Sequence, residues 1–199
     1  RYEQYVAVTF GLSKRYSHRW MLDGSFTYAD WKINYGGDYL DPTNMSYLED
    51  GPAATAAQSA DLAGVLVHSR WTAKLSGLVR LPWGFNASAV LTAREGYILP
   101  TYTLVERPNI GPTQLYGLAG GGGKIGDTRL PALFLLNVRL EKVIPIGDRI
   151  RLAVGADGFN ILNASTALKR EGRIEAADFL QDKLILNPGV FRLGARVSF

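Results

Sequence analysis

Hydrophobic and polar residues alternate one by one along several stretches of the chain. In the last stretch, from Gly189 to Phe199, every second residue is apolar, and these residues are Phe191, Leu193, Ala195, Val197 and Phe199. The residues between them are Arg192, Gly194, Arg196 and Ser198. Because successive side chains of a strand point to opposite faces, this pattern predicts a strand with one apolar face and one polar, cationic face.

Six further stretches show the same alternation, and each predicts a strand of the same kind. They run from Glu3 to Leu12, Trp20 to Trp31, Arg70 to Leu81, Phe85 to Arg94, Leu136 to Glu141 and Ile150 to Asp157. We therefore expect about seven antiparallel strands, each with one apolar face.

The connections between these strands alternate in length. Short turns are expected at Ser13 to Arg19, Pro82 to Gly84 and Ile144 to Asp148, and long connections at Lys32 to Ser69, Glu95 to Leu130 and Leu162 to Pro188. Transmembrane barrels have tight periplasmic turns and long extracellular loops, whereas compact soluble domains rarely carry three structureless connections of more than about 15 residues. The pattern predicts an all-β fold, an antiparallel transmembrane β-barrel segment of about seven strands. Its C-terminus would be periplasmic and its long loops extracellular.

Composition is compatible with a sheet that has one apolar and one wet face. Aromatic residues make up 11% of the chain and the net charge is +4. No apolar run approaches the roughly 20 residues of a spanning helix. Zero cysteines exclude disulfides, thiolate metal sites and cysteine nucleophiles. The basic residues alternate along the strands and do not gather into a patch with interleaved aromatics, so we expect no nucleic-acid partner.

The motifs that suggest chemistry are incomplete. Gly120 to Lys124 resembles a phosphate-binding loop but lacks the Ser or Thr that should follow the lysine, so a solvated loop is the better interpretation. The only two histidines, His18 and His68, are expected at opposite ends of the sheet, which argues against a catalytic triad or a zinc site. We expect no enzyme activity, no catalytic residues, no cofactor and no resident metal.

Two other stretches leave alternatives open. Asp38, Asp41, Asn44, Glu49 and Asp50 supply hard oxygen ligands, either for calcium in an outer loop or for a solvated turn, because their spacing misses the EF-hand pattern. The stretch from Ile174 to Leu184 is amphipathic at helical spacing. It predicts a short helix, packed on the loops or available to a partner.

Several segments together resemble a known family. They are Arg129-Leu-Pro, Asn137-Val-Arg-Leu-Glu-Lys142, Asp157-Gly-Phe-Asn-Ile-Leu-Asn163, Ile185-Leu-Asn-Pro188 and the strand from Phe191 to Phe199. In order and spacing they resemble the C-terminal barrel of TonB-dependent outer-membrane receptors. Within that family they are most similar to the Oar-like receptors that carry a carboxypeptidase-regulatory-like domain. Lys14 to Trp20 is similar to the family's periplasmic turn, and Arg94-Glu-Gly-Tyr97 to its Arg-Ser-Gly-Tyr strand end.

The chain departs from the family pattern at two positions. Gly158 stands where the family usually has a larger residue, and Glu95 stands where serine is common.

The resemblance implies a barrel of about 22 strands with an N-terminal plug, driven from the inner membrane through TonB. Residues 1–199 would be its C-terminal portion, with the plug, the TonB box and any regulatory domain upstream of Arg1. The apolar face of the last strand, Phe191, Leu193, Ala195, Val197 and Phe199, would be the signal read by the outer-membrane insertion machinery. Outer-membrane lipid and lipopolysaccharide would surround the wall.

The expected function is therefore binding and active import of an extracellular small ligand, glycan or peptide. Aromatic hydroxyl side chains in the long loops are candidate ligand contacts, namely Tyr35, Tyr39, Tyr47, Tyr102 and Tyr116. The alternatives are a passive porin or adhesive outer-membrane barrel and, third, a soluble β-sandwich lectin.

Overall fold

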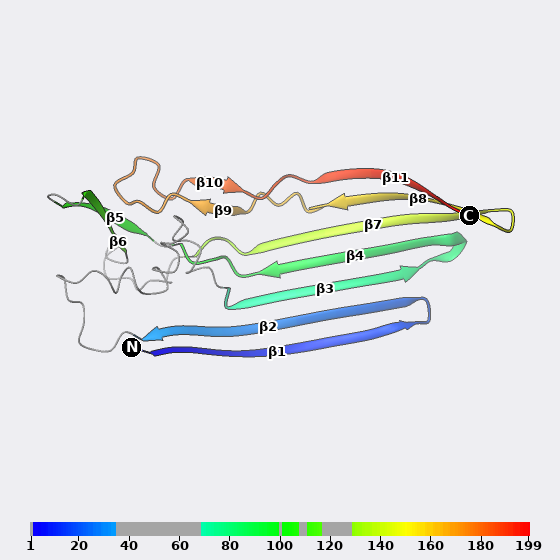
Figure 1. Cartoon of the computed structure of the whole chain (residues 1–199), viewed down its shortest axis with the longest axis horizontal. Helices are drawn as coiled ribbons and strands as arrows, with labels where there is room; N and C mark the ends of the chain where they lie inside the picture. The colour runs from blue at the N-terminus through cyan, green and yellow to red at the C-terminus, as the bar shows by residue number, and fades with distance from the viewer. Residues whose placement is uncertain (1, 35–68, 100, 108–110, 117–128) are drawn as a thin grey trace.

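The main body of the protein is an antiparallel sheet of seven strands. The computed structural model describes residues 2–34, 69–99, 101–107, 111–116 and 129–199. The strand order is β1-β2-β3-β4-β7-β8-β11, so each strand lies beside its neighbours in the chain apart from two interposed hairpins (Figure 1). The bounds are β1 Tyr2–Ser17, β2 Trp20–Asn34, β3 Trp71–Arg80, β4 Phe85–Arg94, β7 Leu133–Ile146, β8 Ile150–Phe159 and β11 Val190–Ser198. The predicted seven-stranded antiparallel sheet is confirmed.

Two small hairpins lie outside this sheet. One consists of β5 (Tyr102–Arg107) and β6 (Gly111–Tyr116), and the other of β9 (Ala167–Arg170) and β10 (Asp182–Ile185). Neither hairpin is predicted by the alternation of apolar and polar residues. In the part of the chain that the structure describes, the only helical element is a single 3-10 turn at Pro82–Gly84, and no helix has the length and hydropathy of a membrane span.

One expectation about a loop is wrong. The stretch from Ile174 to Leu184 forms no α-helix, because consecutive turns run to Leu180 and β10 begins at Asp182. Leu180 has a positive φ of 64°, a left-handed conformation that no right-handed helix contains. Pairing of Asp182 with Arg170 and of Ile185 with Ala167 satisfies the backbone that a helix would have satisfied internally.

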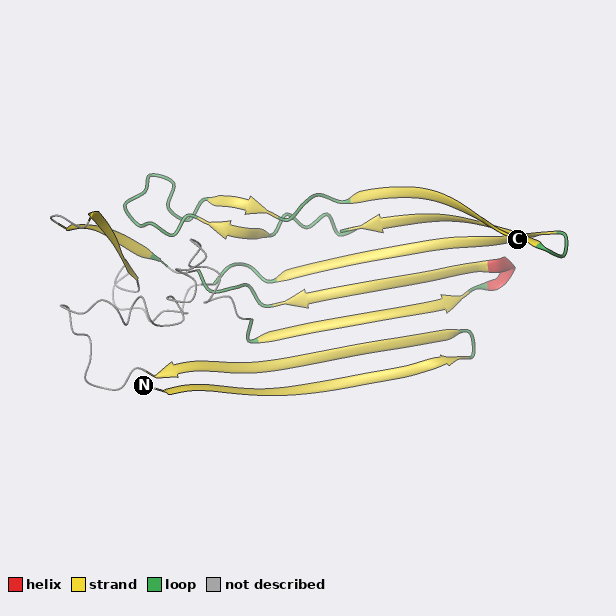
Figure 2. Ribbon diagram, in the orientation of Figure 1, coloured by secondary structure: helices red, strands yellow, loops and turns green. Residues whose placement is uncertain are grey.

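The two ends of the sheet differ in how its strands are connected. At one end, here called the turn end, short turns join β1 to β2, β3 to β4 and β7 to β8, and the chain's C-terminus lies there (Figure 2). The strand ends that the long connections join, and both small hairpins, lie at the opposite end, here called the loop end. The alternation of connection lengths predicted from sequence is confirmed.

The short turns depend on left-handed backbone. His18 and Arg19 have φ of 51° and 70°, the pair of positive values that a two-residue type I′ hairpin turn requires. In the second turn Trp83 and Gly84 have φ of 59° and 79°, and a Cβ on Gly84 would lie 2.7 Å from the carbonyl oxygen of Val143. Only glycine fits that close approach between strands.

Register gives the sheet one apolar face. Directly paired residues lie on the same side of a sheet, and one row of pairs across five strands reads Phe10, Phe26, Ala73, Ala93 and Phe134. Within the described side chains from Val6 to Val197, every residue on this side is apolar or glycine except Lys14, Asp30 and Lys142. We call this side the apolar face and the opposite side the polar face.

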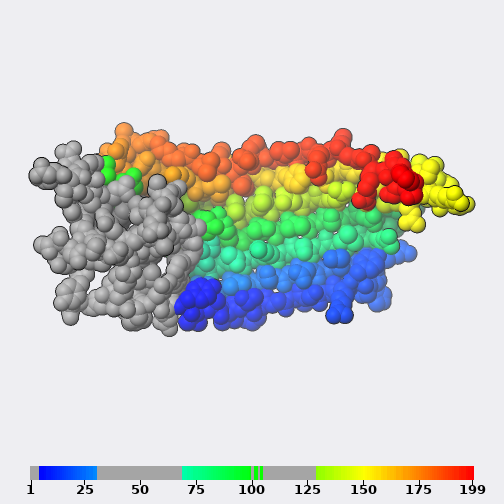
Figure 3. Space-filling model, in the orientation of Figure 1, coloured from blue at the N-terminus to red at the C-terminus, as the bar shows by residue number. Residues whose placement is uncertain are grey.

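The described residues contain almost no hydrophobic core. The buried apolar residues are only Ala29, Ala93, Ile98, Leu99, Ala153, Ala167 and Ala176, and no large side chain among the described residues is fully buried. The strands lie edge to edge from blue β1 to red β11 (Figure 3), and large side chains such as Phe10, at 67% exposure, project from the apolar face. The sheet is open, since β1 pairs only with β2 and β11 only with β8 among the described strands.

Candidate functional site

Charged side chains form a ladder across the polar face of β7, β8 and β11. Register places Arg139, Asp157 and Arg192 in one row. Arg139 lies 2.7 Å from a carboxylate oxygen of Glu141 on its own strand and 3.2 Å from Asp157 Oδ1. Arg192 donates two hydrogen bonds to Asp157 Oδ2, at 2.9 and 2.8 Å. Each carboxylate is thus held by at least one arginine.

Positive charge predominates on the turn-end half of this face. The two acids of the ladder are accompanied by the arginines Arg80, Arg139, Arg151, Arg192 and Arg196. Gly155 leaves room for the Arg139 side chain, whose guanidinium lies 3.5 Å from where a Cβ would be. A surface with such an excess of positive charge attracts anionic groups or an acidic partner surface. The prediction that basic residues line one side of the strands is confirmed.

A second charged cluster lies at the loop end and is centred on Glu95. This residue follows β4, and Arg70, which precedes β3, reaches it through Nε at 2.9 Å and through its backbone N–H at 2.8 Å. Arg129 approaches the same carboxylate to 3.3 Å. Burial by itself would raise the pKa of Glu95, but the hydrogen bonds from Arg70 and the charges of Arg129 and Arg70 outweigh it, and the pKa is lowered. The carboxylate therefore stays ionised and ties three segments together.

The residues beside Glu95 explain the Arg94-Glu-Gly-Tyr97 motif. A Cβ on Gly96 would lie 1.6 Å from the carbonyl oxygen of Leu130, so only glycine lets the two backbones meet. Arg129 donates to the Gly96 carbonyl at 3.2 Å, and the Arg94 guanidinium lies over the Tyr97 ring at 3.5 Å. Glu95 is the residue that joins Arg70 to Arg129.

Asn160 holds the exit of β8 and the entry of β11 together. It is 3% exposed and has a φ of 48°, a conformation that asparagine tolerates. Its side-chain amide donates to the carbonyls of Ala164 (3.1 Å) and Asn187 (2.8 Å), while its backbone N–H donates to Asn137 Oδ1 (2.9 Å). Asn163 makes a similar link, because its Oδ1 accepts a hydrogen bond from the Gly189 N–H at 3.0 Å. The last long connection is therefore anchored at both ends.

Packing around Gly158 explains why this position holds a glycine. A Cβ there would lie 2.6 Å from a methyl group of Ile161 and 3.2 Å from the ring of Phe191. Glycine lets these two apolar side chains close over the strand.

Of the tyrosines proposed as ligand contacts, the structure describes two. Tyr102 and Tyr116 are register partners in the hairpin of β5 and β6, and Tyr35, Tyr39 and Tyr47 lie outside the described residues. Tyr102 also bonds through its backbone to Gly172 and Ile174, and its pKa is raised by burial and by the nearby charge of Glu171. The hairpin is thereby attached to the last long connection, and the ligand role of the tyrosines stays a prediction.

The residues proposed as an assembly signal lie as expected. Phe191, Leu193, Ala195 and Val197 share the apolar face on the edge strand β11, and Phe199 follows them at the turn end. All five are exposed. Their recognition by the insertion machinery stays a prediction.

The described residues contain no group of three or more His, Asp or Glu side chains that could hold a metal ion. The acidic cluster from Asp38 to Asp50, His68 and the glycine run from Gly120 to Lys124 all lie outside the described residues. His18 lies in the first short turn.

Comparison of the chain with protein-family models, with curated proteins and with solved structures finds no match.

Proposed function

We propose that this chain is part of the wall and outer loops of an outer-membrane β-barrel, namely a TonB-dependent receptor that imports an extracellular ligand. The observation that carries the proposal is the continuous apolar face. It crosses all seven strands in register and remains exposed while the described residues bury almost no core.

A surface of this kind needs an apolar environment. Monomeric soluble proteins rarely expose contiguous apolar patches of more than a few hundred Å², and a soluble sandwich would cover this face with a second sheet. The described elements supply no second sheet over it. Lipid on the apolar face and water on the polar face agree with the alternation in every strand.

The proposed orientation follows from the connections. Short turns at the C-terminal end would face the periplasm, and the loop end would face the outside. The strands of the seven-stranded sheet have 9 to 16 residues, which suits a requirement of about 9–11 tilted residues per span. The two free edges, β1 and β11, would pair with further strands of the same barrel, because hydrocarbon does not tolerate an unpaired edge.

The receptor assignment rests on the family resemblance and on the hydrogen bonds and ion pairs that tie the loop end together. The Glu95 cluster and Asn160 fix the bases of two long connections, so that the loops emerge from a defined framework. Such a framework favours ligand capture because it limits the conformational freedom lost on binding. The cationic polar face would line the barrel interior.

The test begins with the full-length protein expressed in a Gram-negative host. We expect it in the outer-membrane fraction and expect it to migrate differently on gels before and after heating. A soluble protein without this heat-dependent migration would contradict the proposal.

Planar bilayers then separate a receptor from a porin. A receptor closed by a plug should show no steady conductance, whereas a passive porin conducts continuously. Continuous conductance would favour the porin alternative. Ligand-dependent growth that requires an intact TonB system would complete the assignment.

A further inference from the structure

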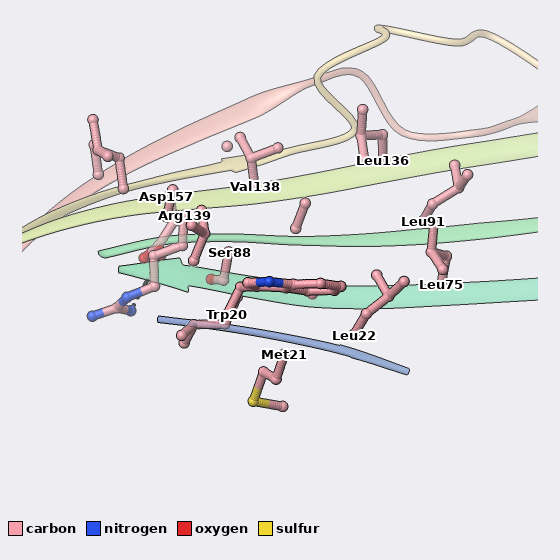
Figure 4. Close-up of a pocket in the computed structure, with 18 of the residues that line it drawn as sticks. Trp20, Met21, Leu22, Leu75, Ser88, Leu91, Leu136, Val138, Arg139 and Asp157 are labelled. Atoms are coloured by element: carbon pink, nitrogen blue, oxygen red, sulfur yellow. Dashed lines mark hydrogen bonds and ion pairs between the residues drawn. The ribbon is translucent and has the colours of Figure 1, made fainter. Parts of the chain in front are cut away.

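The apolar face carries a shallow groove of about 920 Å³ across its middle, from Trp20 and Leu22 on β2 to Phe191 on β11. Its floor contains small residues, Gly77, Ala87 and Ala89 on the adjacent strands β3 and β4 and Ala156 on β8. Leu140 of β7 lies between Ala87 and Ala156. Leu22, Leu75, Leu91 and Leu136 border the floor, with Trp20 at the turn end, whereas Met21 points to the other side of β2 (Figure 4).

The dimensions of the groove suit hydrocarbon chains. It crosses three rows of paired residues, which correspond to about 14 Å along the strands because two residues advance a strand by about 6.8 Å. Almost all of its lining surface is apolar, although Ser88, Arg139 and Asp157 of the polar-face rows also border it.

A single lysine lies at the turn-end margin of this groove. Lys142 occupies the apolar face, one row beyond Leu140, and its register partners are Phe85 and Val154. Its ammonium lies 4.7 Å from the centre of the Phe85 ring. No ion pair joins Lys142 to an acidic side chain within the described part of the chain.

The other lysine of this face whose side chain the structure describes is Lys14, and its ammonium group already has partners. Lys14 Nζ donates to the carbonyls of Ser17 (3.0 Å) and Trp20 (3.1 Å) and lies 3.8 Å above the Trp20 ring. Lys14 therefore closes the first turn, whereas Lys142 presents its charge beside the groove.

We propose that this groove and Lys142 form a binding site for an anionic glycerophospholipid, with the acyl chains on the small-residue floor and the phosphate at Lys142. The site and the lipid have complementary charge, because a cation beside an apolar groove fits a ligand with an apolar body and one anionic group. The inference rests on the proposed function, in which the turn end faces the periplasmic leaflet. Because that leaflet consists of phospholipid, the proposed ligand is a phospholipid and not lipopolysaccharide.

The test measures lipid binding to the full-length protein purified in detergent, by native mass spectrometry with titrated phosphatidylglycerol, phosphatidylethanolamine or lipopolysaccharide. Lys142→Gln should weaken phosphatidylglycerol binding about fivefold, the weight of one lysine near an anionic surface, with little change for phosphatidylethanolamine. Lys142→Arg should retain binding. Lys74→Gln, which removes a lysine from the polar face of β3, is the matched control and should change nothing.

A second pair of variants tests the acyl-chain floor without changing charge. Ala89→Leu fills the floor and should reduce retention of both phospholipids, whereas Ala73→Leu adds the same bulk to the same face outside the groove and should not. Both variants keep the face apolar, so both proteins should fold.

The outcomes separate the two proposals. If the protein inserts in membranes but Lys142→Gln behaves like Lys74→Gln, or if the site prefers lipopolysaccharide, the lipid site is refuted and the barrel proposal stands. If the protein does not enter membranes at all, both fail.

Discussion

Replacing Leu193 by arginine introduces a charge on the apolar face and distinguishes a lipid environment from water. Leu193 is 84% exposed in the seven-stranded sheet. If this face met water, the substitution would remove only the remaining sixth of the leucine's burial. Full burial of a leucine contributes about 1.5–3 kcal/mol, so the loss would be about 0.2–0.5 kcal/mol.

In a bilayer the same substitution has a much larger effect. An arginine on the lipid face near the midplane destabilises a transmembrane barrel by about 2–4 kcal/mol. Gly194→Arg is the matched control, because it introduces the same side chain at the next position on the polar face. A Cβ at Gly194 meets nothing within 4 Å, so this variant should change stability by about 0.5 kcal/mol or less.

The assay is guanidinium unfolding of the full-length protein in phosphatidylcholine vesicles, with heat-dependent gel migration as the measure of folded barrel. The account predicts that Leu193→Arg destabilises the protein by at least about 2 kcal/mol and that Gly194→Arg remains close to wild type. Equal losses for the two variants, or a loss below about 1 kcal/mol for Leu193→Arg, would refute the assignment of the faces.

Three further predictions concern the loop end. The pKa of Glu95 is lowered from 4.5, so its ion pairs should stabilise the loop end at neutral pH. This stabilisation should be lost as the pH falls below about 4.5 and through the lower pKa of the folded protein. Amide hydrogen exchange at residues 95–99 should therefore become faster at low pH, and an exchange rate protected equally at all pH values would contradict this prediction. Gly96→Ala should destabilise by about 1–3 kcal/mol through the clash with Leu130, while Gly11→Ala, whose Cβ meets nothing within 4 Å, should be close to neutral in the same unfolding assay. Asn160→Ala should lower the free energy of unfolding by about 1–3 kcal/mol and make residues 160–189 more accessible to protease. Asn163→Ala removes one hydrogen bond and should have a smaller effect. Equal protease resistance of the wild type and both variants would show that Asn160 does not anchor this connection.

The strands were predictable because their pattern has a strict period. Along β3, Trp71, Ala73 and Leu75 alternate with Thr72 and Lys74, and one-residue alternation identifies both the strand and its two faces. The strand positions also predicted which connections are short and which are long. The ends of strands were less accurate: β1 extends to Ser17, beyond the predicted Leu12, because a hairpin pairs for as long as its partner strand continues.

The charged cluster and the loop hairpins could not be predicted, because they depend on contacts between segments far apart in sequence. The residues next to Glu95 in the sequence do not indicate that Arg70 and Arg129 are its partners. The amphipathic spacing of Ile174 to Leu184 favoured a helix, but pairing with the segment around Arg170 decided its backbone. A signal for Asn160 was available, since an asparagine directly after a strand often adopts a left-handed conformation.

The most direct test of the central claim is the sidedness of the two ends in intact cells. The chain has no cysteine, so single cysteines at Leu180 (loop end) and Asp148 (turn end) would be the only reactive thiols of this chain. Both residues are exposed. The account predicts that an impermeant maleimide labels Leu180→Cys on intact cells and labels Asp148→Cys only after the outer membrane is permeabilised. Labelling of Asp148→Cys on intact cells, or of Leu180→Cys only after permeabilisation, would contradict a wall that crosses the outer membrane with its loops outside.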